Sequence, residues 1–195
     1  MKRSASPAGW LGPLDAAGQQ VVWWTAVLHA ARGGQAWAAT GPLLLVALHL
    51  VLQPAGRSRI AAAGAMAALY GLATDTVLCR SGLLAFAASP GATTAWMVAL
   101  WSVFGVALTA SLRSVAGWSV PVQALAAAVA GPLAYRAGAA LGAISLPGGS
   151  APALAAVALQ WALGLPALAA VARGELWPGE PAGEPPTSAR LGSPR

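Results

Sequence analysis

Long apolar runs separated by short polar segments dominate the chain. Each run approaches the length that a helix needs to cross the hydrocarbon core of a bilayer, roughly 17–25 residues. The connecting segments are rich in arginine, glycine, proline and serine, which end helices and form turns. We therefore predict about six hydrophobic helices. They cover residues 16–31, 35–53, 60–78, 95–112, 120–140 and 151–172.

Two of these runs depart from the simple pattern. The first is short and contains Gln19 and Gln20. The fifth contains Gly131-Pro132, and a proline removes a backbone donor and frees the carbonyl one turn earlier. We expect the helix to be interrupted there. Broken helices line substrate sites in some transporters, although many prolines only kink a helix.

The composition places these helices in a membrane. Hydrophobic residues make up 57% of the chain and charged residues 8%, against about a quarter charged in soluble domains. So few charges do not cover the surface of a soluble protein, whereas lipid solvates an apolar surface directly. The fold class predicted is therefore all-α, a polytopic transmembrane helical bundle of about six spans.

The basic residues indicate an orientation rather than a nucleic-acid partner. The net charge is +6, but the basic side chains are scattered and form no patch. With six spans, eight of the eleven Lys and Arg residues fall on one side and three on the other. Because positive charge favours the cytoplasmic side, both termini are predicted to be cytoplasmic. Without the short first span, the N-terminus would lie outside.

The segments outside the spans differ in composition. Residues 1–15 carry no hydrophobic region or cleavage site of a secretory signal, and we expect them to remain as a short cytoplasmic segment. Residues 16–172 form the transmembrane domain. Residues 173–195 are rich in Pro, Gly, Glu and Ser and are predicted to be a disordered cytoplasmic tail.

Asp75 is the polar residue whose placement inside a membrane would cost the most free energy. It lies near the outer end of the third span, where a carboxylate in lipid costs roughly 2.5–3.5 kcal/mol or more. Steps of four, three and four residues place Gly64, Ala68, Gly71 and Asp75 on one face of the helix. Small residues permit close helix approach, so this face is expected to point into the bundle.

Two interpretations of Asp75 remain open. One is a proton or cation site. The other is a structural ion pair or a helix-end hydrogen bond, with Arg136, Arg32 or Thr76 as the partner. Because Arg136 lies at a similar depth in the fifth span, we predict an Asp75–Arg136 pair, with Arg32 as the rival.

Further polar residues complete the set of candidates. The candidate functional cluster near the outer leaflet consists of Asp75, Thr76, His29, Arg32, Tyr135 and Arg136. His49, near the inner end of the second span, is a second candidate. With the two histidines at opposite membrane faces and Cys79 the single cysteine, we expect no metal and no cofactor.

Short motifs in a fixed order carry a resemblance to a known family. They are Ala31 with Gly33, Trp37 with Gly41-Pro42-Leu43, His49-Leu50, Gly71, Asp75-Thr76, Gly82-Leu83, Trp96, Leu100-Trp101, Ser111-Leu112, Gly131-Pro132-Leu133, Tyr135, Gly138 and Leu141-Gly142-Ala143. From Trp24 to Ala172 the chain resembles an uncharacterised family of bacterial inner-membrane proteins, domain of unknown function 2878. Where that family has Asp-Ser this chain has Asp75-Thr76, which keeps the hydroxyl. The resemblance implies a multi-pass inner-membrane protein and supplies no activity.

Two functional hypotheses follow. The first is a non-enzymatic membrane protein, either small and transporter-like or an accessory subunit, with a lipid-like ligand or a membrane-protein partner in the bilayer. It is based on one inward-facing acidic residue beside a broken helix. The alternative is an intramembrane enzyme acting on a lipid or isoprenoid near the outer leaflet, with Asp75, His29, Tyr135 and Arg136 as its candidates.

Overall fold

The computed structural model describes residues 11–86, 89 and 91–175. Its elements are α1 (Leu11–Ala31), α2 (Gln35–Leu52), a 3-10 turn (Pro54–Gly56), α3 (Arg57–Arg80), β1 (Ala85–Phe86), α4 (Ala95–Ala107), α5 (Arg113–Ala116), α6 (Val120–Ala140), β2 (Ile144–Ser145) and α7 (Ser150–Arg173). The prediction of an all-α chain is confirmed. The predicted segment 1–15 and the predicted tail both extend into residues outside the described part.

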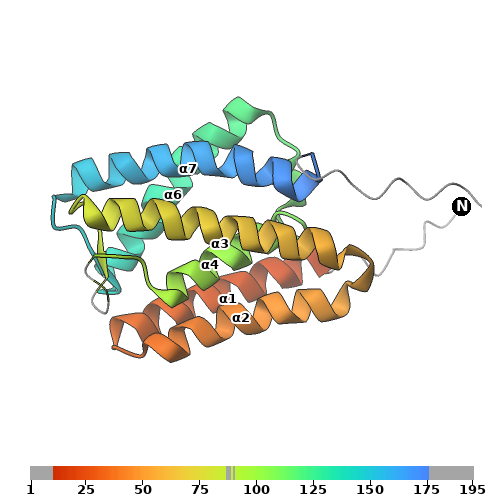
Figure 1. Ribbon diagram of the computed structural model, residues 1–195, viewed down its shortest axis with the longest axis horizontal. Helices are drawn as coiled ribbons and strands as arrows, with labels where there is room; N and C mark the ends of the chain where they lie inside the picture. The colour runs from red at the N-terminus through yellow and green to blue at the C-terminus, as the bar shows by residue number, and fades with distance from the viewer. Residues whose placement is uncertain (1–10, 87–88, 90, 176–195) are drawn as a thin grey trace, which may run out of the picture.

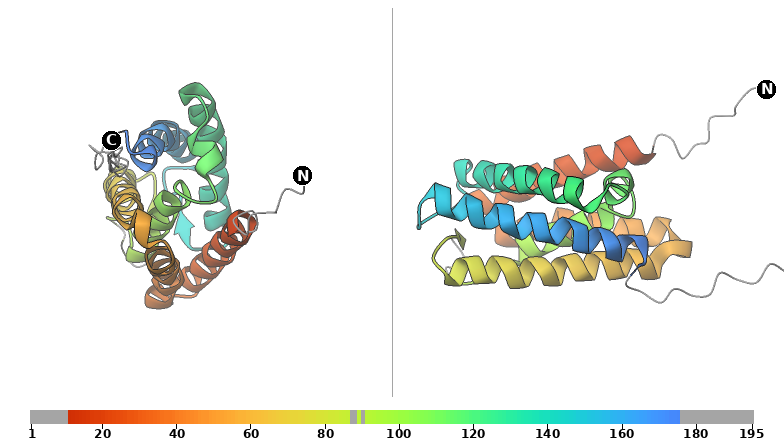
Figure 2. Two further views of the ribbon diagram at one scale, coloured as in Figure 1. Left: turned by 90° about the vertical axis from the view of Figure 1, so that its right-hand side faces the viewer. Right: turned by 90° about the horizontal axis from the view of Figure 1, so that it is seen from above.

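The long helices run alternately up and down the bundle (Figure 1). As a result α1 begins and α7 ends at the same end of the bundle, which we call the terminal end. The opposite end, which we call the loop end, holds the α1–α2, α3–α4 and α6–α7 connections. Seen along the bundle, α4 lies inside the ring formed by the other long helices and contacts α1, α2, α3 and α7 (Figure 2).

Within the described part of the chain, three helical segments are long and apolar enough to cross a membrane: Gln35–Leu52, Pro54–Arg80 and Ser150–Arg173. The helix Ala95–Ala107 is apolar but shorter. Large hydrophobic side chains are exposed along α2, α3 and α7, and also along α1 and α6, including Leu125 and Leu133. An exposed apolar surface of this extent is typical of a membrane protein.

The element bounds correct three expectations. α1 begins at Leu11, earlier than expected, so Asp15 belongs to a helix. α4 ends at Ala107, and residues 108–112 form a tight turn in place of the expected end of the fourth span. The predicted interruption at Gly131-Pro132 is wrong, because α6 continues through both residues. The glycine there allows a close helix contact, described below, rather than a break.

A two-stranded sheet closes the loop end. β1 and β2 pair antiparallel, with Ala85 opposite Ser145 and Phe86 opposite Ile144. The pairing joins the α3–α4 connection to the α6–α7 connection. Phe86 and Ile144 are buried, so the sheet adds apolar side chains to one end of the core.

Candidate functional site

Asp75 lies at the centre of a buried hydrogen-bond cluster contributed by four helices. It is 0% exposed. Its Oδ1 accepts hydrogen bonds from the Tyr135 hydroxyl at 2.6 Å and from Gln160 Nε2 at 2.7 Å. Its Oδ2 accepts one from Trp101 Nε1 at 2.9 Å. Gln160 Nε2 also donates to Thr74 Oγ1 at 2.7 Å. A carboxylate only accepts, so three surrounding donors replace the water it loses on burial.

Three glycines bring the helices of this cluster together. A side chain at Gly71 of α3 would overlap the indole of Trp101, which places that ring against Asp75. Gly131 of α6 makes room for Trp161 in the same way, and Gly164 of α7 makes room for Tyr70. These contacts show why small residues lie on the inner faces of the helices: each accommodates a large ring from a neighbouring helix.

The predicted ion pair between Asp75 and Arg136 is wrong. Among the described residues no basic side chain forms an ion pair with Asp75, and both Arg136 and Arg32 are exposed. The reason is helical geometry. Tyr135 and Arg136 are consecutive, so their side chains point about 100° apart around α6. Tyr135 takes the inward position, and Arg136 takes one on the surface of the bundle.

Two other members of the predicted cluster lie away from Asp75. Thr76 is next to it in sequence, but its Oγ1 accepts a hydrogen bond from the backbone N–H of Thr93, in the α3–α4 connection. His29 is exposed, and its Nδ1 lies 2.7 Å from the carbonyl oxygen of Thr25 on its own helix. Of the six predicted residues, the structure therefore brings together Asp75 and Tyr135.

A pocket of about 320 Å³ lies on the other side of Trp101 and Tyr135 from Asp75. It is bounded by α1 and α6, with α4 as its floor and Trp161 of α7 as part of its wall. Most of its lining is apolar: Ala16, Trp23, Val27, Trp96, Met97, Leu100, Trp101, Val103, Phe104, Leu112, Ala130, Ala134, Gly138, Ile144 and Trp161. Its polar lining residues are Gln19, Gln20, Ser111 and Tyr135. Because Gln20 and Ala130 are exposed, the pocket opens on the flank of the bundle.

The aromatic wall of the pocket is a single stack that reaches Asp75. The rings of Trp101 and Trp161 have centroids 4.7 Å apart, and those of Phe104 and Trp161 5.0 Å apart. Tyr70 meets Trp101 edge to face at 5.6 Å. Rings packed this way hold one another in fixed positions. Trp101 therefore belongs both to the wall of the pocket and to the donors of Asp75.

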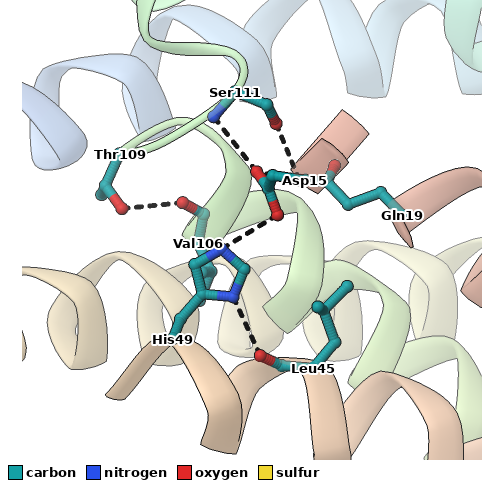
Figure 3. A network of polar contacts seen from close by, with 7 residues as sticks. All are labelled: Asp15, Gln19, Leu45, His49, Val106, Thr109 and Ser111. Carbon is teal, nitrogen blue, oxygen red and sulfur yellow. Dashed lines mark hydrogen bonds and ion pairs between the residues drawn. The ribbon is translucent and has the colours of Figure 1, made fainter. Parts of the chain in front are cut away.

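A second polar cluster lies near the terminal end, where α1, α2 and the turn after α4 meet (Figure 3). His49 Nε2 lies 2.9 Å from Asp15 Oδ1, and His49 Nδ1 lies 2.9 Å from the carbonyl oxygen of Leu45. Asp15 Oδ2 accepts hydrogen bonds from Gln19 Nε2 at 2.9 Å and from the backbone N–H of Ser111 at 3.2 Å. Through Asp15, the cluster connects α1 to α2 and to the turn after α4. It gives His49, the second predicted candidate, an acidic partner.

Three residues of these clusters were not among the predicted site residues: Asp15, Gln160 and Trp101, which the sequence indicated only as part of a family motif. Gln160 carried a usable signal, because an amide in the middle of an apolar span needs a partner. Asp15 was assigned to a segment before the first span. No group of three or more His, Cys, Asp or Glu side chains within the described part of the chain is arranged to hold a metal ion.

Together these features define a helical membrane protein with a lateral apolar pocket beside the buried hydrogen-bond cluster of Asp75. The chain belongs to the protein family of unknown function DUF2878, which it matches over residues 14–167. The predicted resemblance to that family is confirmed. Neither the curated proteins nor the solved structures contain a match to this chain.

Proposed function

We propose that the protein spans the bacterial inner membrane several times and holds one lipid-like molecule in the pocket between α1 and α6. It would act as a small carrier or as an accessory subunit of a membrane complex. The observation that carries the proposal is the pocket, an apolar and aromatic space with its rim on the flank of the bundle. In a bilayer that flank faces hydrocarbon, so apolar molecules reach the pocket without crossing water.

Six membrane-crossing helices are part of this proposal. α1 and α6 each have 21 residues, about 32 Å at 1.5 Å per residue, which matches a hydrocarbon core of about 30 Å. α4 has 13 residues, about 20 Å, but it is enclosed by other helices. Non-helical backbone at its ends is tolerated where it is buried in protein.

Two of the three exposed tryptophans among the described residues support the same placement, while the third, Trp24, lies within α1. Trp37, 71% exposed, lies at the start of α2 near the loop end, and Trp118, 45% exposed, lies just before α6 near the terminal end. Indole rings prefer the two interfaces of a bilayer. These two side chains therefore mark the levels of the two lipid headgroup layers.

The test is to find a ligand that depends on the pocket. The full chain is purified in mild detergent, and native mass spectrometry measures lipid-sized molecules that remain bound. Ala134 lines the pocket, whereas its neighbour Leu133 is 62% exposed on the outside of α6. We expect a bound molecule in the wild type and in Leu133→Phe, and at least a tenfold lower occupancy in Ala134→Phe. If both variants retain the bound molecule equally, the pocket is not its binding site.

The enzyme hypothesis is a second candidate because one observation favours it. Tyr135 lines the pocket, and its hydroxyl donates a hydrogen bond to the buried carboxyl group of Asp75 at 2.6 Å. A phenol that is hydrogen-bonded to a carboxyl group can relay a proton between a bound molecule and that carboxyl group. Such an enzyme would act on a lipid or isoprenoid in the half of the membrane near the loop end, which is the outer leaflet in the proposed orientation.

Lipid extracts distinguish the two candidates. Extracts are compared from a deletion strain carrying the wild-type gene, Asp75→Asn, Tyr135→Phe or Arg136→Gln. An enzyme predicts a lipid species that changes in the deletion strain and is restored by the wild type and by Arg136→Gln only. A carrier or accessory role predicts that no lipid is chemically converted.

A further inference from the structure

We infer that the ligand of the pocket is an uncharged lipid-like alcohol. Its hydroxyl lies between Gln19 and Ser111, and its hydrocarbon chain runs along α1 towards Trp96. This inference rests on the proposed function and names the chemical class of its ligand. It is carried by the pattern of hydrogen-bond donors and acceptors at one end of the pocket.

The lining of the pocket offers no counterion to a charged group bound inside it. Among the described residues that form it there is no Lys, Arg, His, Asp or Glu side chain. A charged group buried without a partner costs several kcal/mol, far more than a neutral polar group with hydrogen bonds. A phosphate, a carboxylate or an ammonium group would have no counterion within this wall. The ligand's polar group is therefore neutral.

The amide orientation of Gln19 is fixed by its neighbours. Gln19 Nε2 lies 2.9 Å from Asp15 Oδ2 and 2.8 Å from Ser111 Oγ. A carboxylate oxygen accepts and never donates, so the side-chain NH₂ group has to face Asp15. Both hydrogens of the NH₂ group are therefore donated in hydrogen bonds, one to Asp15 and one to Ser111. What Gln19 offers to the pocket is its carbonyl oxygen, which accepts no hydrogen bond from the described residues.

Ser111 supplies the complementary group. Its Oγ accepts the hydrogen bond from Gln19, and its own hydroxyl hydrogen can turn either to the adjacent Asp15 carboxylate or to a molecule in the pocket. The end of the pocket thus presents one acceptor and one donor side by side. A ligand hydroxyl carries one donor and accepts as well, so it satisfies both at once. A simple carbonyl satisfies only the donor, and an alkane satisfies neither.

The two ends of the pocket differ in this respect. At the end nearer the loop end, the polar group is the Tyr135 hydroxyl, whose hydrogen is already donated to Asp75. The end at Gln19 and Ser111 offers a donor together with an acceptor. In the proposed membrane orientation this end lies towards the cytoplasmic headgroup layer. A lipid alcohol of the inner leaflet would enter with its hydroxyl at that level and its chain pointing inward.

The shape of the pocket fits one hydrocarbon chain. Along α1 the lining extends from Ala16 to Val27, a rise of about 16 Å. A volume of about 320 Å³ over that length gives a mean cross-section of about 20 Å², close to one chain when carbon atoms contact at roughly 4 Å. At about 30 Å³ for each methylene-sized group, the pocket holds about ten groups. A longer chain would continue past the exposed rim into the bilayer.

Brominated probes of equal length test the inference, because bromine quenches the indole fluorescence of Trp96, Trp101 and Trp161 in the pocket. The full chain in lipid nanodiscs is titrated with 10-bromodecan-1-ol, 10-bromodecanoate and 1-bromodecane. The saturable part of the quenching is measured. We expect the alcohol to bind at least tenfold more tightly than either of the others.

Variants assign the binding to the named atoms. Ser111→Ala removes the donor and keeps the backbone N–H that bonds Asp15, so it should weaken alcohol binding about five- to tenfold and leave bromodecane unchanged. Gln19→Leu is a second variant with the same expected direction. Thr25→Val is the matched control on α1, because Thr25 is exposed and bonds only its own helix. It should bind all three probes like the wild type.

The outcomes separate the inference from the proposed function. Saturable quenching that disappears in Ala134→Phe, but with the carboxylate or the bromoalkane bound as tightly as the alcohol, overturns the alcohol and keeps the pocket. The same holds if Ser111→Ala and Gln19→Leu both bind the alcohol like the wild type. If no probe gives saturable quenching, or if Ala134→Phe leaves it unchanged, the pocket as a lipid site is overturned with it.

Discussion

Asp75 is buried among uncharged donors rather than beside a cation. Trp101, Tyr135 and Gln160 come from three different helices and meet on its two oxygens. Each hydrogen bond in a membrane protein contributes on average less than about 1 kcal/mol, but a buried polar atom left without a partner costs more than that. The cluster therefore joins α3, α4, α6 and α7 in one arrangement, and Tyr135 and Trp101, which both line the pocket, connect Asp75 to it.

Asp75→Asn should lower the thermal stability of the protein in detergent. The asparagine keeps one acceptor, but its NH₂ group faces donors, so one of them loses its partner at a cost of about 1–3 kcal/mol. We expect a fall in Tm of about 5 °C by differential scanning fluorimetry. Arg136→Gln is the matched control, because Arg136 is exposed and forms no ion pair with Asp75. A loss of similar size in the Arg136 variant would revive the ion pair that the sequence predicts.

His49 and Asp15 should be energetically coupled. Their side chains are 9% and 11% exposed, and removing one leaves the other largely buried without its partner. His49→Gln and Asp15→Asn should each lower Tm, and the double variant should lose less than the sum, with a coupling energy of about 1–2 kcal/mol. His29→Gln should leave Tm unchanged, because His29 is exposed and contacts only a backbone carbonyl of its own helix. Additive losses would mean that the pair contributes nothing to stability.

At the scale of the helices, stability depends on glycines that face aromatic rings. Gly71 lies under the indole of Trp101 and Gly131 under that of Trp161. A ring inserted between two helices needs a residue without a side chain opposite it, because protein interiors are closely packed. This explains why Gly131 and Pro132 lie in an unbroken α6: the glycine serves the helix contact rather than a hinge.

Gly71→Ala should destabilise the protein although alanine is the better helix former. The added methyl group overlaps the Trp101 ring, and overpacking of this kind costs about 1–3 kcal/mol. Gly18→Ala is the matched control. Nothing lies within 4 Å of a Cβ at Gly18, so the helix preference of alanine should raise stability by up to about 1 kcal/mol. Chemical denaturation of both variants measures the difference, and equal shifts would contradict the packing role of Gly71.

The sequence predicted the helices better than it predicted their contacts. Apolar runs bounded by turn residues locate every long helix, because lipid demands continuous hydrogen-bonded backbone. The partners of Asp75 were harder to find. Tyr135 and Arg136 are neighbours in sequence, and only the rotation of α6 decides which of them faces inward. The pairing of Asp15 with His49 depends on where α1 begins, and helix ends are the least certain part of a sequence pattern.

At the scale of the whole molecule, the arrangement of the helices and the basic residues give the same orientation. The start of α1 and the end of α7 lie at one end of the bundle (Figure 1). Among the described residues, those near this end include Arg57, Arg59, Arg113 and Arg173, and those towards the loop end include Arg32, Arg80 and Arg136. The other four Lys and Arg residues of the sequence precede residue 11 or follow residue 175. For the proposed membrane arrangement, the positive-inside rule predicts that the terminal end is cytoplasmic. The polar end of the pocket, at Gln19 and Ser111, would lie near the cytoplasmic leaflet.

Reporter fusions test this orientation and the six spans together. Fusions made after Arg57 and after Arg173, at the terminal end, should report a cytoplasmic location. Fusions after Gly34 and after Gly148, in loop-end connections, should report the periplasm. The fusion after Gly34 is the decisive one, because it reports on α1, whose hydropathy does not place it among the three long apolar segments. If that fusion is cytoplasmic while the fusion after Arg57 is also cytoplasmic, α1 and α2 do not cross the membrane separately. The pocket would then border the cytoplasmic surface instead of the hydrocarbon core, and a lipid would have no lateral path into it.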